Sequence, residues 1–396
     1  MDLEPLEEAL WAAAERRFGA GVRCQRDLVR AIKAQSARYT RQHDDDKKLS
    51  GPTSLLARAL FFTLADVPKP VIALEELMSR YQLVLPPRPR ILDVGAGCGA
   101  MSFGTLIWLQ QHHNALKSVE LYALDRDHEA LALMTEALDL AQKEERSTLP
   151  ATKLEVSRIA LDRRGATKRA LAHKAPYDLV LAGTVLNELP PRESAALVRQ
   201  LLRQLTPQGV LLITEPALKE CTRALHGLRN ELIVAGTCHV LLPCTHGGPC
   251  PLVAHEDHWC HESRIWPMPP PRMRQIAAAC GLRRRDIKFS FLALQRAEGP
   301  MLKRHYTMPW RVVGSPGRLK GRAERWICGP LGLHRARGLE RHRRAGNESF
   351  FTSRRGELLD LGGSDAHQER LLITDETRVE ARDPARLWAH EHNPST

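Results

Sequence analysis

The pattern of apolar and polar positions divides the chain into parts with different periods. Residues 3–18, 54–67 and 71–81 carry apolar side chains at helical spacing, and a polar stretch at 41–54 interrupts them. Residues 1–85 are therefore expected to form a helical N-terminal domain. From residue 90 onward, short apolar runs alternate with helical patterns, which is typical of βα units and a parallel sheet. The expected strands are RILDV, VELYALD, YDLVLAG, GVLLITEP and FSFLALQR.

These elements predict an α/β fold with a Rossmann-like sheet over residues 86–298. A Cys-rich insertion at 238–265 interrupts this domain late, before its last strand. Residues 299–360 form a basic extension with strand-like pieces, and 361–396 are polar and expected to be a flexible tail. No apolar run approaches the roughly 20 residues needed to cross a bilayer, so no membrane partner is expected. The acidic start of the chain and its odd number of cysteines favour a cytoplasmic location.

Positive charge is concentrated in one segment. The net charge is +12, and residues 301–356 contain 14 Lys or Arg and three Glu, a local charge of +11. Such a cationic surface attracts the phosphates of nucleic acid through counterion release. RNA or DNA is favoured as its partner over the alternative of a solvated arginine-rich face.

A glycine-rich turn, LDVGAGCGA, follows the first expected strand and precedes a helix. Glycines there let a ligand approach the backbone at the N-terminus of the helix. The second expected strand ends at Asp125, where a carboxylate can accept hydrogen bonds from a ribose diol. We therefore expect a nucleoside-bearing cofactor. Its predicted contacts in the turn are Asp93, Gly95, Gly97 and Gly99.

The form of this turn resembles motif I of class I methyltransferases, and the loop TVLNEL resembles one of their later motifs. The resemblance favours S-adenosylmethionine over NAD as the cofactor. Asn187 and Glu188 would then lie at the carboxyl end of the fourth strand, beside the methionine part of the cofactor. Their alternative role is to cap the next helix. The N/D-P-P-Y/F signature of amino-methyltransferases is absent from the sequence, so no catalytic residue is predicted.

Three cysteines, Cys244, Cys250 and Cys260, lie within 17 residues among glycines, prolines and histidines. Their wide spacing and the Cys-Pro pairs favour an iron–sulfur cluster. Zinc, with nearby histidines, is the alternative. A fourth ligand must come from elsewhere. Cys328, in the polar stretch RAERWICGP, is favoured and Cys238 is the alternative, whereas Cys221 and Cys280 lie in apolar helical patterns.

Taken together, several motifs resemble the family of methyltransferase-like protein seventeen and its yeast mitochondrial small-subunit counterpart. They are LDVGAGCG, TVLNEL, LLITEP, PCTHGGPCPL followed by DHWCH, and a distant cysteine in a basic strand, within about residues 40–335. The resemblance implies a protein of the small ribosomal subunit that binds its rRNA and acts in assembly or translation. It also implies a 4Fe-4S cluster on Cys244, Cys250, Cys260 and Cys328.

Two further hypotheses describe the protein as an enzyme. The first is an active rRNA methyltransferase that uses S-adenosylmethionine. The second is a cytosine-5 methyltransferase, suggested by the pairs Pro243-Cys244 and Pro249-Cys250. The second is disfavoured, because the enzymes it resembles place their Pro-Cys pair after the fourth strand and this chain has both pairs after the fifth.

Overall fold

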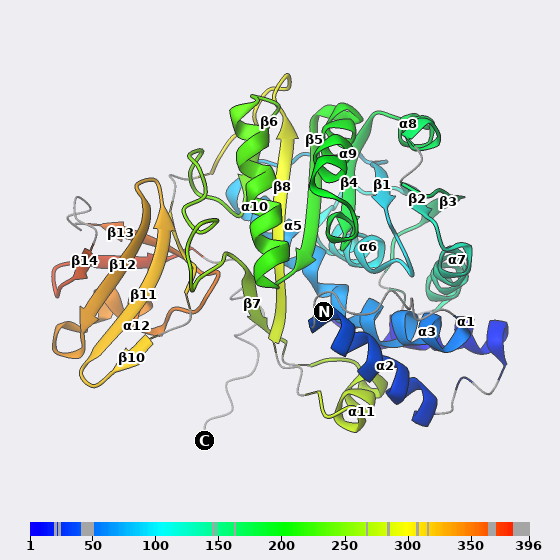
Figure 1. Ribbon diagram of the computed structural model, residues 1–396, viewed down its shortest axis with the longest axis horizontal. Coiled ribbons are helices and arrows are strands. Elements are labelled where there is room, and N and C mark those ends of the chain that lie inside the picture. The colour runs from blue at the N-terminus through cyan, green and yellow to red at the C-terminus, as the bar shows by residue number, and fades with distance from the viewer. Residues whose placement is uncertain are drawn as a thin grey trace.

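Two β-sheets lie side by side in the computed structural model, and the larger one carries helices on both faces (Figure 1). The described residues are 1–19, 22, 25–40, 51–144, 147, 149–161, 164–266, 268–282, 286–305, 309–314, 317–362 and 370–382. Within these ranges, no helix has the length and apolar character that a membrane span requires.

The larger sheet has eight strands in the order β3-β2-β1-β4-β5-β8-β6, with β7 also paired to β8. Strands β1 to β5 are parallel, and β8 runs antiparallel to its neighbours. The predicted strands RILDV, VELYALD and YDLVLAG are confirmed as β1, β2 and β4. The bounds are β1 Arg90–Val94, β2 Val119–Asp125, β3 Thr152–Arg158, β4 Tyr177–Gly183, β5 Leu205–Pro216, β6 Cys238–Leu242, β7 Glu262–Ile265 and β8 Asp286–Arg296.

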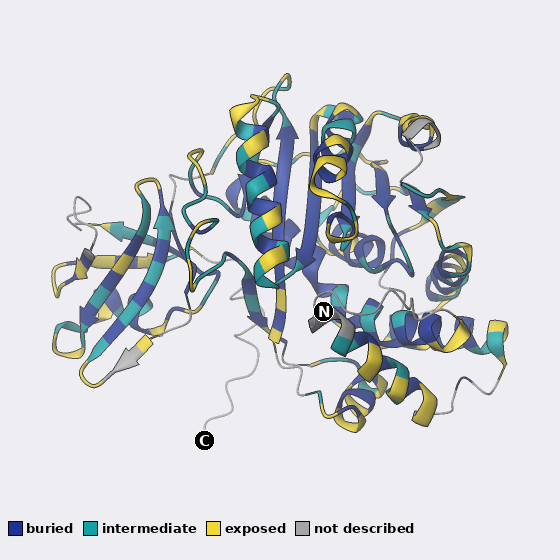
Figure 2. Cartoon of the chain, in the orientation of Figure 1, coloured by how far each residue is buried: buried dark blue, intermediate teal, exposed yellow. Residues whose placement is uncertain are grey.

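Helices cover both faces of this sheet because successive strand residues point to opposite sides. Ile91 belongs to one core, and its neighbour Leu92 belongs to the other. The first core is covered by α6 (Ala100–His112), α7 (His128–Lys143), α11 (Pro271–Ala279) and the N-terminal helices, and the second by α8 (Arg164–Ala172), α9 (Pro191–Arg203) and α10 (Lys219–Val234). Figure 2 shows the central strands as buried, with α9 and α10 exposing their outer sides.

The N-terminal helices form a layer on the first face and share its core. They are α1 (Glu4–Phe18), α2 (Gln25–Thr40), α3 (Pro52–Ala57), the π-helix η2 (Arg58–Thr63), α4 (Leu64–Asp66) and α5 (Pro68–Arg80). α1 packs on α7, and α5 packs on α6. Gly104 permits the second approach, because a Cβ there would lie 2.2 Å from the carbonyl oxygen of Val67. The helices expected over residues 1–85 thus lie against the sheet as one of its layers.

The chain after β8 builds the second sheet, in the order β14-β12-β11-β9-β13-β15, with β10 paired to β11. Its elements are β9 Trp310–Val312, β10 Gly317–Leu319, β11 Arg322–Gly329, β12 Gly332–Leu339, α12 Glu348–Thr352, β13 Leu358–Gly362, β14 Arg370–Ile373 and β15 Arg378–Ala381. A separate apolar core lies within it.

The prediction of a flexible tail from residue 361 is wrong for β14 and β15. Leu371, Ile373 and Val379 are buried in the core of the second sheet, while Leu372 between the first two is exposed. This alternation is the period of a half-buried strand. The polar composition of residues 361–396 predicts a tail, and the apolar alternation that contradicts this prediction spans only a few residues. Residues 363–369 and 383–396 of the predicted tail lie outside the described residues.

Candidate functional site

The glycine turn lies where the strand order reverses. β1 and β4 are neighbours, and the chain proceeds outward from β1 to β3 on one side and from β4 to β5 on the other. In an open parallel sheet this reversal leaves a crevice at the carboxyl ends of the strands, where ligands bind. The turn of residues 95–99 joins β1 to α6 at that edge.

The three glycines of the turn have different surroundings. Their φ angles are 70° at Gly95, 53° at Gly97 and 92° at Gly99, a region that favours glycine. A Cβ at Gly95 would lie 2.3 Å from Val185, and one at Gly99 would lie 2.8 Å from Met134. A Cβ at Gly97 would meet none of the described atoms within 4 Å. Gly97 is therefore the point where a ligand can approach the backbone of the turn.

Asp93 is fully buried beneath this turn. Its Oδ2 accepts a hydrogen bond from Ser102 Oγ at 2.6 Å, whereas its Oδ1 has no hydrogen-bond partner among the described residues. Burial raises the pKa of Asp93 to about 7 despite the bond from Ser102, and the charge of Asp125 adds to the increase. A buried carboxylate oxygen without a partner is a suitable acceptor for a ligand donor.

Asp125 stands at the end of β2, beside the open side of the turn. Its Oδ2 accepts from the N–H of Gly97 at 2.8 Å, and its Oδ1 accepts from the N–H of Asp127 at 2.8 Å. Asp125 thus binds Gly97 at the carboxyl edge of the sheet, and Asp93 lies buried beneath the same turn. This donor and acceptor set fits a nucleoside cofactor, which presents hydroxyl groups to an acid at this strand end.

Glu215, which the sequence did not single out, organises the loop after β4. Its buried Oε1 accepts from the N–H groups of Val185 at 3.1 Å and Leu186 at 2.8 Å. Burial raises the pKa of Glu215 to about 7, against the effect of these bonds. In the amide orientation that satisfies both of its polar atoms, Asn187 donates to Glu215 Oε2 at 3.0 Å. In the sequence, the position of Glu215 near the end of the predicted strand GVLLITEP is the feature that could indicate this role.

Asn187 and Glu188 therefore have different surroundings. Asn187 supports the loop through Glu215, whereas Glu188 forms an exposed ion pair with Arg126 at 2.9 Å. Neither side chain caps α9, which begins at Pro191 without a side-chain cap bond. Their role as cofactor contacts stays a prediction.

Replacement of Asp93 by asparagine is expected to change how stability depends on pH. The folded pKa of about 7 lies above the ordinary aspartate value of 3.8, so the folded state binds more protons and wild-type stability falls as pH rises from about 4 to about 7. Between pH 5 and pH 8 the free energy of unfolding of the wild type should fall by on the order of 3 kcal/mol, and that of the variant should not. Urea unfolding without cofactor at both pH values measures it. The exposed control Asp139→Asn should keep the wild-type slope, and parallel slopes for Asp93→Asn and wild type would contradict the assignment.

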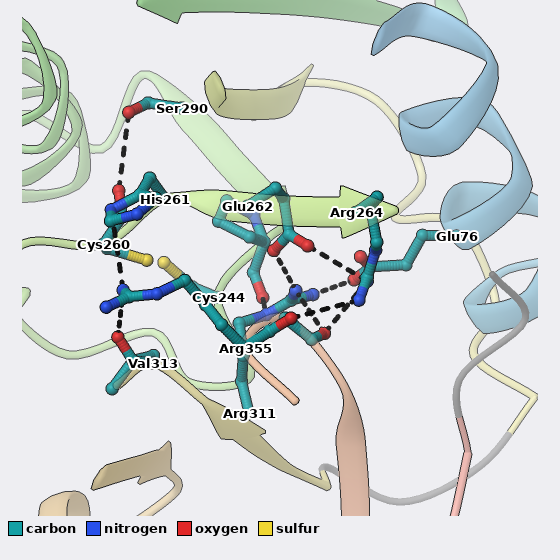
Figure 3. A network of polar contacts seen from close by, with 12 residues as sticks. Glu76, Cys244, Cys260, His261, Glu262, Arg264, Ser290, Arg311, Val313 and Arg355 are labelled. Carbon is teal, nitrogen blue, oxygen red and sulfur yellow. Dashed lines mark hydrogen bonds and ion pairs between the residues drawn. The ribbon is translucent and has the colours of Figure 1, made fainter. Parts of the chain in front are cut away.

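The cysteines predicted as metal ligands lie in one neighbourhood. Cys250, Cys260 and Cys328 belong to one small cluster of packed side chains, and the sulfurs of Cys244 and Cys260 lie close together in Figure 3. Burial raises the pKa of Cys260 well above its ordinary value, and the charges of the other three cysteines add to the increase. The alternative fourth ligand, Cys238, lies in the core beneath α10.

Side chains of α10 hold the main chain of the cysteine loop. Arg229 is fully buried and donates to the carbonyl oxygens of His246 at 3.0 Å and Gly248 at 2.8 Å. The neighbouring Asn230 Oδ1 accepts from the N–H of Cys250 at 2.9 Å. The shape of the loop is therefore defined by a helix that precedes it in the chain.

The polar groups around the sulfurs suit thiolate ligands. Backbone groups of Leu252 and Val253 hydrogen-bond the Cys250 sulfur, and His246 Nε2 lies 3.4 Å from Cys328 Sγ. Such bonds offset the negative charge of metal-bound thiolates. In the described part of the chain, no group of three or more His, Cys, Asp or Glu is placed to hold a metal ion. The thiols are thus gathered, but they do not surround a single ion.

A buried network of ion pairs joins this loop to both sheets (Figure 3). Arg311 of β9 donates to Glu262 of β7 at 2.6 Å, to Glu76 of α5, and to the carbonyl oxygen of Pro243 at 2.9 Å. Arg80 of α5 donates to Glu76 at 2.9 Å. The Arg311, Glu76 and Glu262 side chains are each no more than 3% exposed. The network therefore fixes the start of the cysteine loop between the N-terminal layer and the second sheet.

Part of the positive charge of residues 301–356 is structural. Arg311 and Arg325 are buried, and Arg325 donates to the Phe351 carbonyl oxygen at 2.7 Å. Arg335 is paired with Glu324. Only part of the local charge of +11 that the sequence shows is therefore available to a partner. The exposed cations among the described residues of this segment are Lys303, Lys320, Arg335, Arg341, Arg344 and Arg354.

The doubly wound sheet with a reversed strand between β5 and β6, and the glycine turn after β1, define a class I methyltransferase-like fold. The chain belongs to the family described as "Mitochondrial small ribosomal subunit Rsm22", whose model matches residues 69–356. No curated protein matches the sequence.

Solved methyltransferase structures are similar at low identity. Magnesium protoporphyrin IX methyltransferase from Synechocystis PCC 6803 with bound SAM is 13% identical, with 66% of this chain and 89% of that chain covered and a TM-score of 0.32. A putative class I S-adenosylmethionine-dependent methyltransferase from Listeria monocytogenes is 13% identical, with 77% and 90% covered and a TM-score of 0.40.

Proposed function

We propose that this protein binds S-adenosylmethionine, holds a four-iron cluster and binds the rRNA of the small ribosomal subunit, acting in ribosome assembly or translation. One observation carries the proposal: Cys328 of β11 lies near the three cysteines of a loop that belongs to the larger sheet. The family match, described as a small-subunit protein, supports the partner. A cytoplasmic location stays a prediction, because that description is mitochondrial.

The cofactor would lie against Gly97, with Asp93 and Asp125 as acceptors for its donors. The unpartnered Oδ1 of Asp93 and the open space at Gly97 support this placement. S-adenosylmethionine, when bound, supplies an electrophilic methyl group. The loop held by Glu215 would border the same crevice, because Val185 packs on Gly95.

The cluster would be held by Cys244, Cys250, Cys260 and Cys328. Iron–sulfur clusters are held by cysteine thiolates, and the gathering of these four thiols supports such a ligand set. Its role here is structural, because it would pin the loop of the larger sheet to β11 of the second sheet. The cationic residues of the second sheet would then be held on one rigid surface.

Anaerobic purification followed by metal analysis tests the cluster. We expect brown protein with the iron content of a four-iron cluster, whereas colourless protein with stoichiometric zinc would replace the cluster by a zinc site. Calorimetric titration with S-adenosylmethionine tests the cofactor, with Gly97→Arg as the variant that fills the open space. Co-sedimentation with purified small subunits tests the partner, and failure to co-sediment would remove the ribosomal part of the proposal.

Binding of rRNA is expected to weaken steeply with salt. Four phosphate contacts would lower the affinity roughly 100-fold between 50 and 200 mM salt. The double variant Arg341→Gln/Arg344→Gln should reduce the slope of log affinity against log salt by about 1.5, since both side chains are exposed. Filter binding measures the slope. Lys143→Gln on α7 is the control and should leave it unchanged, and a flat salt dependence of the wild type would exclude phosphate-dominated binding.

An active rRNA methyltransferase is the second candidate, and one backbone feature favours it. Thr184, directly after β4, has a φ of 57°. Non-glycine residues in this region are strained and cluster at functional sites. Transfer of tritium from labelled S-adenosylmethionine to small-subunit RNA, with Gly97→Arg as the blank, decides between binding and catalysis.

A further inference from the structure

The π-helix η2 reaches both sides of the glycine turn. Its first residue, Arg58, donates from Nη2 to Asp127 Oδ2, just beyond the end of β2. Its last residue, Thr63, hydrogen-bonds the thiol of Cys98, which lies within the turn. One six-residue element of the N-terminal layer therefore contacts two parts of the candidate cofactor site. π-helical segments in proteins are frequently found at functional sites.

The contact of Arg58 continues to the predicted ribose acid. Asp127 accepts from the N–H of Glu129 at 3.1 Å at the start of α7, and its own N–H donates to Asp125 Oδ1 at 2.8 Å. Asp125 Oδ2 in turn accepts from the N–H of Gly97. Because each of these groups is held by the next, Arg58 orients Asp125 through Asp127.

Arg58 also balances charge at this point. The carboxylates of Asp125 and Asp127 both interact with its guanidinium group, and its side chain is about one-third exposed. Without this cation, two neighbouring carboxylates would repel each other beside the turn. Val67, four residues after the end of η2, packs closely on Gly104 of α6, so the segment that follows η2 is held against that helix.

We propose that Arg58 is a positioning residue of the cofactor site, and that cofactor binding is coupled to docking of η2 on the turn. The inference rests on the proposed binding of S-adenosylmethionine. A ribose that bonds to a correctly oriented Asp125 favours the docked arrangement, and by linkage the docked arrangement favours the ribose. The N-terminal layer is then part of the cofactor site as well as a cover for the sheet.

Calorimetric titration of the full chain with S-adenosylmethionine and S-adenosylhomocysteine tests the role of Arg58. We expect Arg58→Met to weaken both roughly tenfold, as loss of a charge-assisted contact does, and Arg58→Lys to recover part of the loss. Arg17→Met is the matched control, because Arg17 also joins the layer to α7, through Glu129 at 2.7 Å, without contacting Asp127. Its affinity should stay within about twofold of wild type. Circular dichroism melting verifies that each variant is folded.

Hydrogen exchange of residues 52–66 tests the coupling. S-adenosylmethionine should slow exchange there in the wild type and less so in Arg58→Met. A folded Arg58→Met that binds as tightly as the wild type, or wild-type exchange unchanged by saturating cofactor, overturns the inference and leaves the proposed function standing. A wild type that binds no S-adenosylmethionine overturns both.

Discussion

Replacement of Arg311 by methionine is expected to lower the free energy of unfolding by about 3–5 kcal/mol, the usual effect of removing one partner from a buried ion pair. Arg311 bridges Glu76 and Glu262, and all three side chains are buried. In the variant, Glu76 is still paired with Arg80 and Glu262 is still paired with Arg264, but both carboxylates have lost the cation between them. Urea unfolding at pH 7.5 measures the change.

An exposed ion pair provides the matched control. Arg335 on β12 pairs with Glu324, and its side chain is 47% exposed. Arg335→Met should cost less than about 1 kcal/mol, because solvent screens such pairs. Equal losses in the two variants would contradict the view that the network of Arg311 is a main connection between the sheets.

The deficit of Arg311→Met should also shrink as pH falls. In the wild type, burial tends to raise the pKa of Glu76, but Arg311 and Arg80 together hold it below its usual value. Its favourable contribution is thus present above the unfolded pKa and is lost only as pH falls through the lower, folded pKa. In the variant burial is less opposed, so the folded carboxylate takes up a proton more readily and the variant recovers stability towards pH 5.5. A deficit that stays constant between pH 7.5 and 5.5 would argue against an uncompensated carboxylate.

For the proposed cluster, replacement of Cys328 by serine is expected to remove the iron and the visible absorbance that the cluster would supply. Of the four predicted ligands, it alone comes from the second sheet, so its loss also removes the proposed link through the cluster between the cysteine loop and β11. A loss of about 3 kcal/mol would lower the thermal midpoint by about 4 °C in a chain of this size. Iron analysis and calorimetry of anaerobic protein measure both effects.

Cys238→Ala is the control for Cys328→Ser. Cys238 is buried in β6, within the core beneath α10, so its truncation should cost about 1 kcal/mol and leave the iron in place. The reverse result, with iron retained in Cys328→Ser and lost in Cys238→Ala, would make Cys238 the fourth ligand.

Much of the larger sheet could be read from local patterns. β1, β2 and β4 begin and end where the apolar runs do, because strands buried on both faces appear as nearly continuous apolar segments. The glycine turn was recognisable for a similar reason, since its glycines adopt positive φ angles that few other residues accept. Both signals are contained in a few consecutive residues.

The residues that hold the loops of the site in place are not marked by any such local sequence pattern. Arg229 and Arg80 bind main-chain carbonyl oxygens of the cysteine loop, and in the sequence each is one arginine among many. Glu215 bonds to backbone groups about 30 positions before it. Nothing local distinguishes a buried arginine or glutamate from an exposed one, because the distinction depends on which distant segment packs against it.

The sequence by itself determined β1, β2, β4, β5 and β8 of the larger sheet, the parallel arrangement of the first four of these and the glycine turn, because hydrophobic period and glycine conformation act over a few residues. It also placed three thiols in one loop. Only the tertiary structure decided that Cys328, 82 positions from His246, meets that loop, that η2 lies on the cofactor turn, and that Arg311 and Arg325 point inward. These contacts join segments that are remote in the chain, and they form only when whole sheets and helical layers pack their apolar faces together.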